Sequence, residues 1–180
     1  GGYSVTTTLD HGLDVWDGCG YLRREVGQAS VGDWVRLKIG GPEIDRPLCP
    51  LPKPNPGGPN AVYYRTPDVL SEEAAEFLGL MVADGTVYNR GFRLAKRHED
   101  VVDRFSYLVE SLFGYQTKRT TIGRTPAAEV NSTVLADWVT PLGGTEPNNK
   151  RIPASVFRSP KRVQHAFLRG LFEDGTVNVR

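Results

Sequence analysis

The hydrophobic and polar positions in the first part of the chain follow the pattern of short β-strands. Four segments are rich in Val, Thr, Tyr, Trp and Leu: residues 3–8, 13–16, 21–26 and 33–38. These residue types favour extended backbone, and turn-forming pairs such as Asp17-Gly18 and Gly40-Gly41 punctuate the region. The pattern predicts an all-β domain over residues 1–41.

Proline is concentrated in the next segment, residues 42–68. Its prolines are Pro42, Pro47, Pro50, Pro52, Pro54, Pro56, Pro59 and Pro67. Proline lacks the backbone N–H that the interior of a helix or a central strand requires. The composition therefore predicts a linker between the first domain and a second domain over residues 69–180.

After this segment the apolar period becomes helical. Apolar side chains recur at steps of three and four residues: Leu70, Ala74, Phe77, Leu78 and Met81. Ser71 is placed to cap the first turn, and Asp84-Gly85 ends the run. We expect a helix over residues 71–83.

The rest of the second domain alternates hairpins with helices. The expected elements are a hairpin at 86–96, a helix at 99–113, strands at 116–121 and 127–131, a helix at 133–142, and a last helix from residue 159. Asn89-Arg90-Gly91 is typical of a hairpin turn, and Ser159-Pro160 is typical of a helix start. The order of elements predicts an α+β fold.

A short internal repeat ends two of these helices. Asp84-Gly85-Thr86-Val87 recurs as Asp174-Gly175-Thr176-Val177, 90 positions later. Gly79 and Ala83 place small residues one helical turn apart, so two such helices can approach backbone to backbone. We expect this approach to bring the two repeated aspartates together.

Two adjacent carboxylates repel each other, and a divalent cation relieves that repulsion. Mg²⁺ prefers oxygen ligands and keeps coordination positions open for water and phosphate oxygens. The repeated aspartates, Asp84 and Asp174, therefore indicate a Mg²⁺ site suited to phosphodiester hydrolysis.

Charge distribution adds a polyanion as a candidate partner. The net charge is only +1, but residues 86–165 hold 13 Lys and Arg against 7 Asp and Glu, whereas residues 1–60 hold 6 against 7. The basic excess therefore lies in the second domain, as expected of a surface that binds nucleic acid.

Composition otherwise indicates an ordinary globular protein. Hydrophobic residues make up 39% of the chain, and its longest apolar stretch, residues 74–83, is far shorter than the roughly 20 residues of a membrane span. Cys19 and Cys49 are too few for a disulfide framework. We therefore expect a cytoplasmic location.

Two nine-residue segments resemble the paired motifs of the LAGLIDADG homing endonucleases found in inteins. They are FLGLMVADG at residues 77–85 and FLRGLFEDG at residues 167–175, and Lys150-Arg151-Ile152-Pro153 resembles the Lys-x-Ile-Pro block between them. The resemblance implies that Asp84 and Asp174 are metal-binding catalytic carboxylates and that Lys150 is an active-site lysine. It also implies a repeated αββαββα fold, here with the second repeat truncated.

In that family the hairpins after each motif line a saddle over double-stranded DNA. The basic residues that fit as phosphate or base contacts are Arg90, Arg93, Lys96, Arg97, Lys118, Arg119 and Arg124. Arginine on a two-stranded ribbon reaches base edges in the major groove.

The start of the chain resembles the splicing, or Hint, part of inteins. Thr8-Leu9-Asp10-His11 resembles a block with a Thr-x-x-His core, and residues 29–35, ASVGDWV, resemble the strand that follows it. The resemblance implies that Thr8 and His11 polarise the peptide bond at the upstream splice junction, where a hydrogen-bond donor is needed.

The sequence departs from the family in two respects. Inteins begin with Cys or Ser and end with a His-Asn pair, so a chain from Gly1 to Arg180 is expected to be an intein fragment. Gly79 precedes Asp84 by five residues, but Gly170 precedes Asp174 by only four, which turns the second carboxylate by about 100° around its helix. Glu173 is the alternative ligand.

The expected partners follow from the resemblance: the intein-less host gene as DNA substrate, the host exteins, and no second copy of the chain. Two alternatives stay open. One is a DNA-binding protein on the same scaffold without catalysis, or a degenerate endonuclease, which the shortened second motif favours. The other is a self-processing domain of the hedgehog type, which the two Asp-Gly helices oppose.

Overall fold

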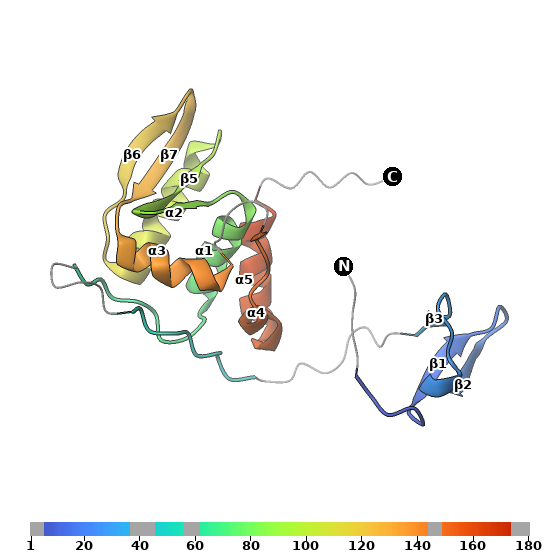
Figure 1. Cartoon of the computed structure of the whole chain (residues 1–180). Helices are drawn as coiled ribbons and strands as arrows, with labels where there is room; N and C mark the ends of the chain where they lie inside the picture. Colours follow the sequence, from blue (N-terminus) through green and yellow to red (C-terminus); the bar gives the residue numbers. More distant parts are fainter. Residues whose placement is uncertain (1–5, 37–45, 56–61, 144–148, 174–180) are drawn as a thin grey trace. The chain divides into compact units, whose positions relative to one another are not determined.

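A computed structural model describes residues 6–36, 46–55, 62–143 and 149–173. The chain forms two compact units, Gly1–Pro42 and Glu43–Arg180, and each is described here by itself (Figure 1). The described parts are mixed α+β, with one small antiparallel sheet in each unit and five α-helices in the second. None of the described helices is long and apolar enough to cross a membrane.

The first unit contains a three-stranded antiparallel sheet. Its strands are β1 (Gly12–Trp16), β2 (Tyr21–Glu25) and β3 (Trp34–Val35), in the order β2-β1-β3, and η1 (Val26–Gln28) is a single 3₁₀ turn. The Asp17 carboxylate accepts hydrogen bonds from the Cys19 and Gly20 N–H groups and so closes the β1–β2 turn. Cys19 and Cys49 are both free thiols.

The strand predictions for this unit are confirmed only in part. The strands expected at 13–16 and 21–26 are present. Of the strand expected at 33–38, Trp34–Val35 is observed, and residues 37 and 38 lie outside the described part. Residues 6–8 are not a strand, and residues 3–5 lie outside the described part. Val15 is the one hydrophobic side chain in the described part of this unit that is fully buried, so this sheet has little core of its own.

The second unit has the predicted order of helices and strands, with one additional short helix. Its elements are α1 (Glu72–Ala83), β4 (Thr86–Tyr88), β5 (Gly91–Ala95), α2 (Glu99–Phe113), β6 (Lys118–Ile122), β7 (Thr125–Val130), α3 (Thr133–Val139), η2 (Thr140–Leu142), α4 (Ala154–Arg158) and α5 (Lys161–Leu171). The Ser71 hydroxyl accepts from the Ala74 N–H and so caps α1, while Gly114 ends α2 with a left-handed backbone (φ 66°). The short helix α4 was not predicted.

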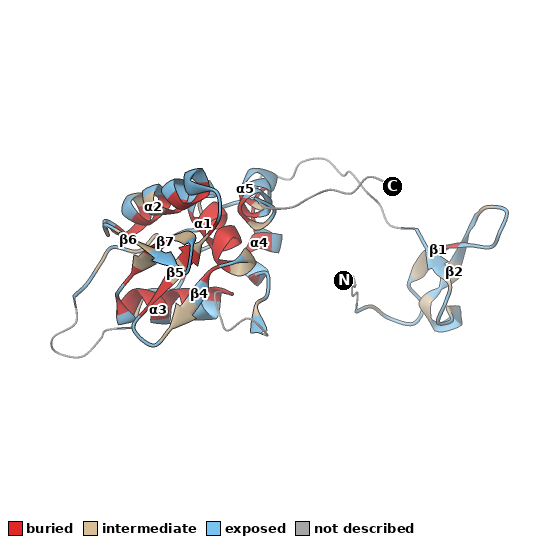
Figure 2. Ribbon diagram, turned by 90° about the horizontal axis from the view of Figure 1, so that it is seen from above, coloured by how far each residue is buried: buried red, intermediate tan, exposed pale blue. Residues whose placement is uncertain are grey.

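The sheet of this unit runs in the order β4-β5-β7-β6, with all neighbours antiparallel. Phe77 of α1 contacts the rings of Phe92 on β5 and of Phe105 and Phe113 on α2, so α1 and α2 cover the same face of the sheet. Figure 2 marks the buried residues of this unit in red on the ribbons of its helices and strands.

Much of the predicted linker is packed against the second unit. Leu51 N–H donates to the Asp68 carbonyl at 2.8 Å, and Leu70 N–H donates to the Cys49 carbonyl at 2.7 Å. The Trp138 indole N–H donates to a carbonyl of the same segment, that of Pro52, at 2.7 Å. The described parts of residues 42–68 form no helix and no extended strand, as predicted, but they belong to the second unit and are not a free linker.

Candidate functional site

Helices α1 and α5 cross in direct backbone contact. A Cβ atom added to Gly79 would lie 2.2 Å from the Phe167 carbonyl oxygen, and one added to Gly170 would lie 2.2 Å from the Glu76 carbonyl oxygen. Atoms cannot approach so closely, so only glycine fits at either position without movement of a helix. The predicted backbone-to-backbone approach of the two motif helices is confirmed.

The two glycines of the contact are spaced differently along the chain from the two Asp-Gly sequences. Gly79 and Gly170 occupy equivalent places in the crossing and are 91 positions apart, whereas Asp84 and Asp174 are 90 positions apart. The second motif is therefore one residue short between its contact glycine and its aspartate. Asp174 lies outside the described residues, so its convergence with Asp84 stays a prediction.

Asp84 caps the C-terminal end of α1 and lies beside a buried lysine. Its side chain is 50% exposed, and its Oδ2 is 2.6 Å from Nζ of Lys96, whose side chain is only 4% exposed. The β5 alternation explains this burial, because Lys96 follows Phe92 and Leu94 on the face that α1 and α2 cover. Lys96 was predicted to bind DNA, but the structure places it with Asp84 and away from the surface.

The second lysine at this helix end is Lys150. Its Nζ donates to the carbonyls of Ala83 (3.2 Å) and Gly85 (2.7 Å), at the end of α1 where the helix dipole is negative. Partial burial lowers the pKa of Lys150, and the Asp84 carboxylate opposes that shift. Lys150 is therefore next to Asp84, as the motif resemblance implied.

Of the two aspartates predicted to bind a metal, the structure describes only Asp84. Within residues 6–36, 46–55, 62–143 and 149–173, no group of three or more His, Cys, Asp or Glu side chains is arranged to hold a metal ion. The half-exposed Asp84 carboxylate fits as one ligand of a divalent cation that takes its other oxygen ligands elsewhere.

The residues predicted to contact DNA divide between the two faces of the sheet. Arg93 and Lys118 both lie opposite Glu129 in the strand register, so they share the face that α1 and α2 leave uncovered. Arg93 lies over the Tyr88 ring, 5.8 Å from its centroid, and 3.7 Å from the Glu129 carboxylate.

The remaining predicted contacts occupy other positions. Arg119 lies on the helix-covered face and pairs with Asp103 of α2, so it points away from Arg93 and Lys118. Arg90 and Arg124 are exposed in the two hairpin turns, and Arg97 is exposed just after β5.

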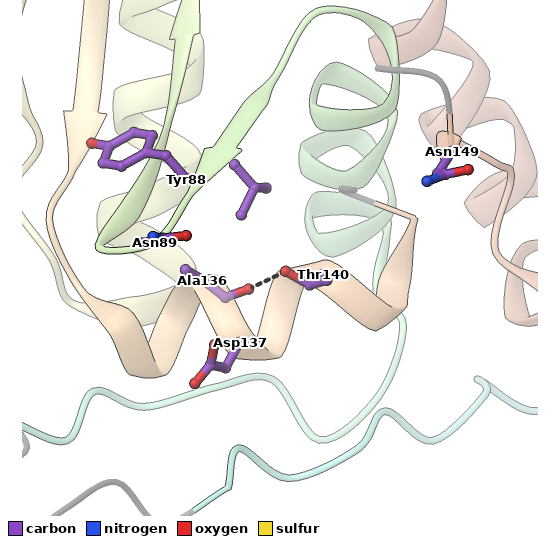
Figure 3. A pocket seen from close by; sticks show the side chains of 7 residues that line it. Tyr88, Asn89, Ala136, Asp137, Thr140 and Asn149 are labelled. Carbon is purple, nitrogen blue, oxygen red and sulfur yellow. Dashed lines mark hydrogen bonds between the residues drawn. The ribbon is translucent and has the colours of Figure 1, made fainter. Parts of the chain in front are cut away.

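Sequence reasoning did not find a polar pocket between the β4–β5 hairpin and α3. Its volume is about 480 Å³, and Figure 3 shows the lining residues: Val87, Tyr88, Asn89, Ala136, Asp137, Thr140 and Asn149. They come from three separate segments without a shared motif, so no pattern along the chain marked them. Asn149 directly precedes Lys150, which places the pocket close to the end of α1.

A buried carboxylate ties α1 to two other helices. Glu76 is 5% exposed and accepts hydrogen bonds from Arg104 of α2 at 2.7 and 2.8 Å and from Arg169 of α5 at 2.7 Å. The bonds from Arg104, assisted by Arg169, hold the pKa of Glu76 below its ordinary value of 4.5. The cluster thus stabilises the arrangement of the helix pair only while Glu76 is ionised.

We expect the substitution Glu76→Gln to lower the free energy of unfolding by about 1–2 kcal/mol at neutral pH, because both arginines are half exposed and keep part of their hydration. Since folding lowers the pKa of Glu76, the difference in stability between the two proteins has its full size above pH 4.5. It disappears as the pH falls through the pKa that Glu76 has in the folded protein. Urea unfolding of both proteins across acid pH measures it. The exposed Glu110→Gln is the control, and a difference that persists in acid contradicts the expectation.

The residues predicted to act in splicing lie at a tight turn in the first unit. His11 N–H donates to the Thr8 carbonyl at 3.2 Å, and both residues are exposed. A hydrogen bond from the Thr8 side chain, with backbone N–H and His11 contributions, lowers the pKa of the Asp10 carboxylate. The turn brings Thr8 and His11 together at one place on the surface of this unit.

Comparison with known proteins finds short similarities to larger enzymes, and no family model matches the chain. It is 32% identical over 110 residues to an A-type ATP synthase subunit of Pyrococcus abyssi, and the matched segment makes up 58% of this chain and 11% of that protein. It is 30% identical over 117 residues to a DNA polymerase of Thermococcus hydrothermalis (58% and 7%). It is 27% identical over 112 residues to the glutamine–fructose-6-phosphate aminotransferase of Methanocaldococcus jannaschii (59% and 10%). The chain thus spans about a tenth of the length of these relatives.

Proposed function

We propose that the chain is part of an intein that carries a LAGLIDADG-type, site-specific DNA endonuclease. The pattern of similarity supports the intein assignment. Each relative matches more than half of this chain, so any two of the matched segments overlap in this chain. Each match nevertheless covers at most 12% of the relative, and the relatives are named for different activities. A domain inserted into different host proteins produces this pattern.

The gene itself tests the intein assignment. An intein requires a Cys or Ser codon at its upstream junction, a His-Asn pair at its downstream junction, and one host protein that reads continuously across both. In this arrangement Thr8 and His11 act at the upstream junction. A reading frame without host sequence on both sides would contradict the assignment.

The endonuclease assignment depends on one observation: α1 and α5 cross through Gly79 and Gly170, and α1 ends at Asp84 with two lysines beside it. In the proposed reaction Asp84 and Asp174 would hold Mg²⁺, which would supply charge neutralisation and an activated water. Lys150, anchored on the carbonyls beside Asp84, places positive charge where a phosphate oxygen becomes more negative.

The uncovered face of the sheet suits the proposed DNA substrate. Arg93, Lys118 and Tyr88 lie on this face, and the two hairpin turns extend it with Arg90 and Arg124. An antiparallel ribbon of this kind fits the major groove of B-DNA, and arginine on it can bind guanine edges. The arginines in the turns then bind phosphates, which set the position of the protein but carry no sequence information.

We expect the full-length protein to cleave the uninterrupted host gene in the presence of Mg²⁺, and Asp84→Asn to reduce the rate about 10²- to 10³-fold, because it removes a metal ligand and its charge. Single-turnover cleavage of a labelled duplex measures the rate, and a mobility shift checks that the variant still binds DNA. Asp100→Asn, an exposed carboxylate in the first turn of α2, is the matched control. Equal rates for Asp84→Asn and the native protein would refute the assignment.

A second candidate is a DNA-binding protein on the same scaffold that no longer cleaves. The spacing of the two motifs favours this candidate, because the contact glycines are 91 positions apart and the aspartates only 90. The second carboxylate is then expected to leave its helix in a different direction from the first. Specific binding of the host-gene site without cleavage would identify this case.

A further inference from the structure

Lys96 is the most deeply buried charged group at the end of α1. Lys96 is the next residue after Phe92 and Leu94 on the buried face of the sheet. An apolar side chain at this position would avoid the free-energy cost of removing a charge from water. An ammonium group at a site this buried requires a strong anionic partner, and Asp84 Oδ2 lies 2.6 Å from it. The Lys96 ammonium thus pairs with a carboxylate that is proposed as a metal ligand.

Lysines also bind the neighbouring oxygen atoms. Nζ of Lys150 lies 3.2 Å from the Ala83 carbonyl oxygen and 2.7 Å from the Gly85 carbonyl oxygen, on either side of Asp84 in the chain. Carboxylate and carbonyl oxygens are the ligands that Ca²⁺ and Mg²⁺ prefer. In the described part of the site, ammonium groups therefore bind the same oxygens that a divalent cation would use.

From this arrangement we infer that Lys96 is an internal counter-cation that competes with the divalent cation for Asp84. Lys96 keeps Asp84 neutralised and correctly placed when no cation is bound, and it raises the cation concentration that the site needs. Lys96 is a positioning residue, and the inference rests on the proposed function of the Asp84 site.

The inference predicts that removing the Lys96 charge tightens cation binding. We expect Lys96→Met to increase the affinity of the DNA-free, full-length protein for Ca²⁺ about tenfold or more, since one positive charge within about 4 Å of the ligand oxygen is worth a few kcal/mol at an effective dielectric constant near 20. Isothermal titration calorimetry with CaCl₂ measures the affinity. Methionine suits the apolar row, and Lys96→Gln is a second variant that keeps a polar side chain.

Two further proteins make the result decisive. Lys161→Met removes an exposed lysine at the start of α5 and should leave the affinity unchanged. Asp84→Asn combined with Lys96→Met should abolish the gain. Affinity for Ca²⁺ that stays the same or weakens in both Lys96 variants, or no Ca²⁺ binding by any of the proteins, would overturn the inference. These measurements contain neither DNA nor a cleavage step, so a protein that fails to cut DNA can still pass them.

Discussion

Gly79→Ala is expected to lower the free energy of unfolding of the second unit by about 2–3 kcal/mol, although alanine is the better helix former. In an unobstructed helix interior the exchange of glycine for alanine stabilises by about 1 kcal/mol. Here the new Cβ would lie 2.2 Å from the Phe167 carbonyl oxygen and 2.9 Å from the Leu171 backbone nitrogen. Because backbone cannot rotate away as a side chain can, α1 and α5 must separate, and the loss of packing exceeds the gain in propensity.

Urea denaturation of the full chain measures this effect, with the exposed Lys161→Ala on α5 as the control. Gly170→Ala is expected to cost a similar amount, since its Cβ would lie 2.2 Å from the Glu76 carbonyl oxygen. The double variant should cost less than the two separate losses combined, because the first alanine has already opened the crossing. A rise of about 1 kcal/mol in the Gly79→Ala protein would show that the helices are not in contact there.

Phe77→Ala is expected to cost about 3–5 kcal/mol, the range for truncating a fully buried aromatic side chain. Phe77 is 0% exposed, and its ring lies 5.3–5.8 Å from the rings of Phe92, Phe105 and Phe113. Its removal leaves a cavity where α1, α2 and the sheet meet, and these elements cannot collapse to fill it.

The same denaturation experiment checks this expectation, and Phe157→Ala on α4 is the matched control because that ring is 62% exposed. The control should change the stability by less than about 0.5 kcal/mol. Equal losses in the two variants would contradict the central role of Phe77 in the core.

The helices of the second unit were predictable because their signals are local. The apolar period and the Ser71 cap predicted a helix over residues 71–83, and the structure has Glu72–Ala83. The period and Gly114 predicted residues 99–113, which is the observed extent of α2. The helix α4 has only five residues, too few to show an apolar period, so it was missed.

The candidate site was predictable only where a motif marks it. Asp84 and Lys150 belong to recognisable blocks, but Lys96 was interpreted from its charge alone, although its strand alternation with Phe92 and Leu94 indicates a buried side chain. Contacts between segments distant in sequence leave no local signal. This is why neither the arginine pair around Glu76 nor the packing of the Pro-rich segment was foreseen.

The crossing of α1 and α5 has a consequence for how such a protein can change over generations. The contact at Gly79 and Gly170 depends on the absence of side-chain atoms, so no substitution at either position preserves it. Asp84 lies outside this contact, but its carboxylate pairs with the buried Lys96 ammonium, so its exchange also has a cost in stability. The two features differ in what can replace them. Another anionic side chain at position 84 can still pair with Lys96, whereas any residue other than glycine at positions 79 and 170 pushes the two helices apart.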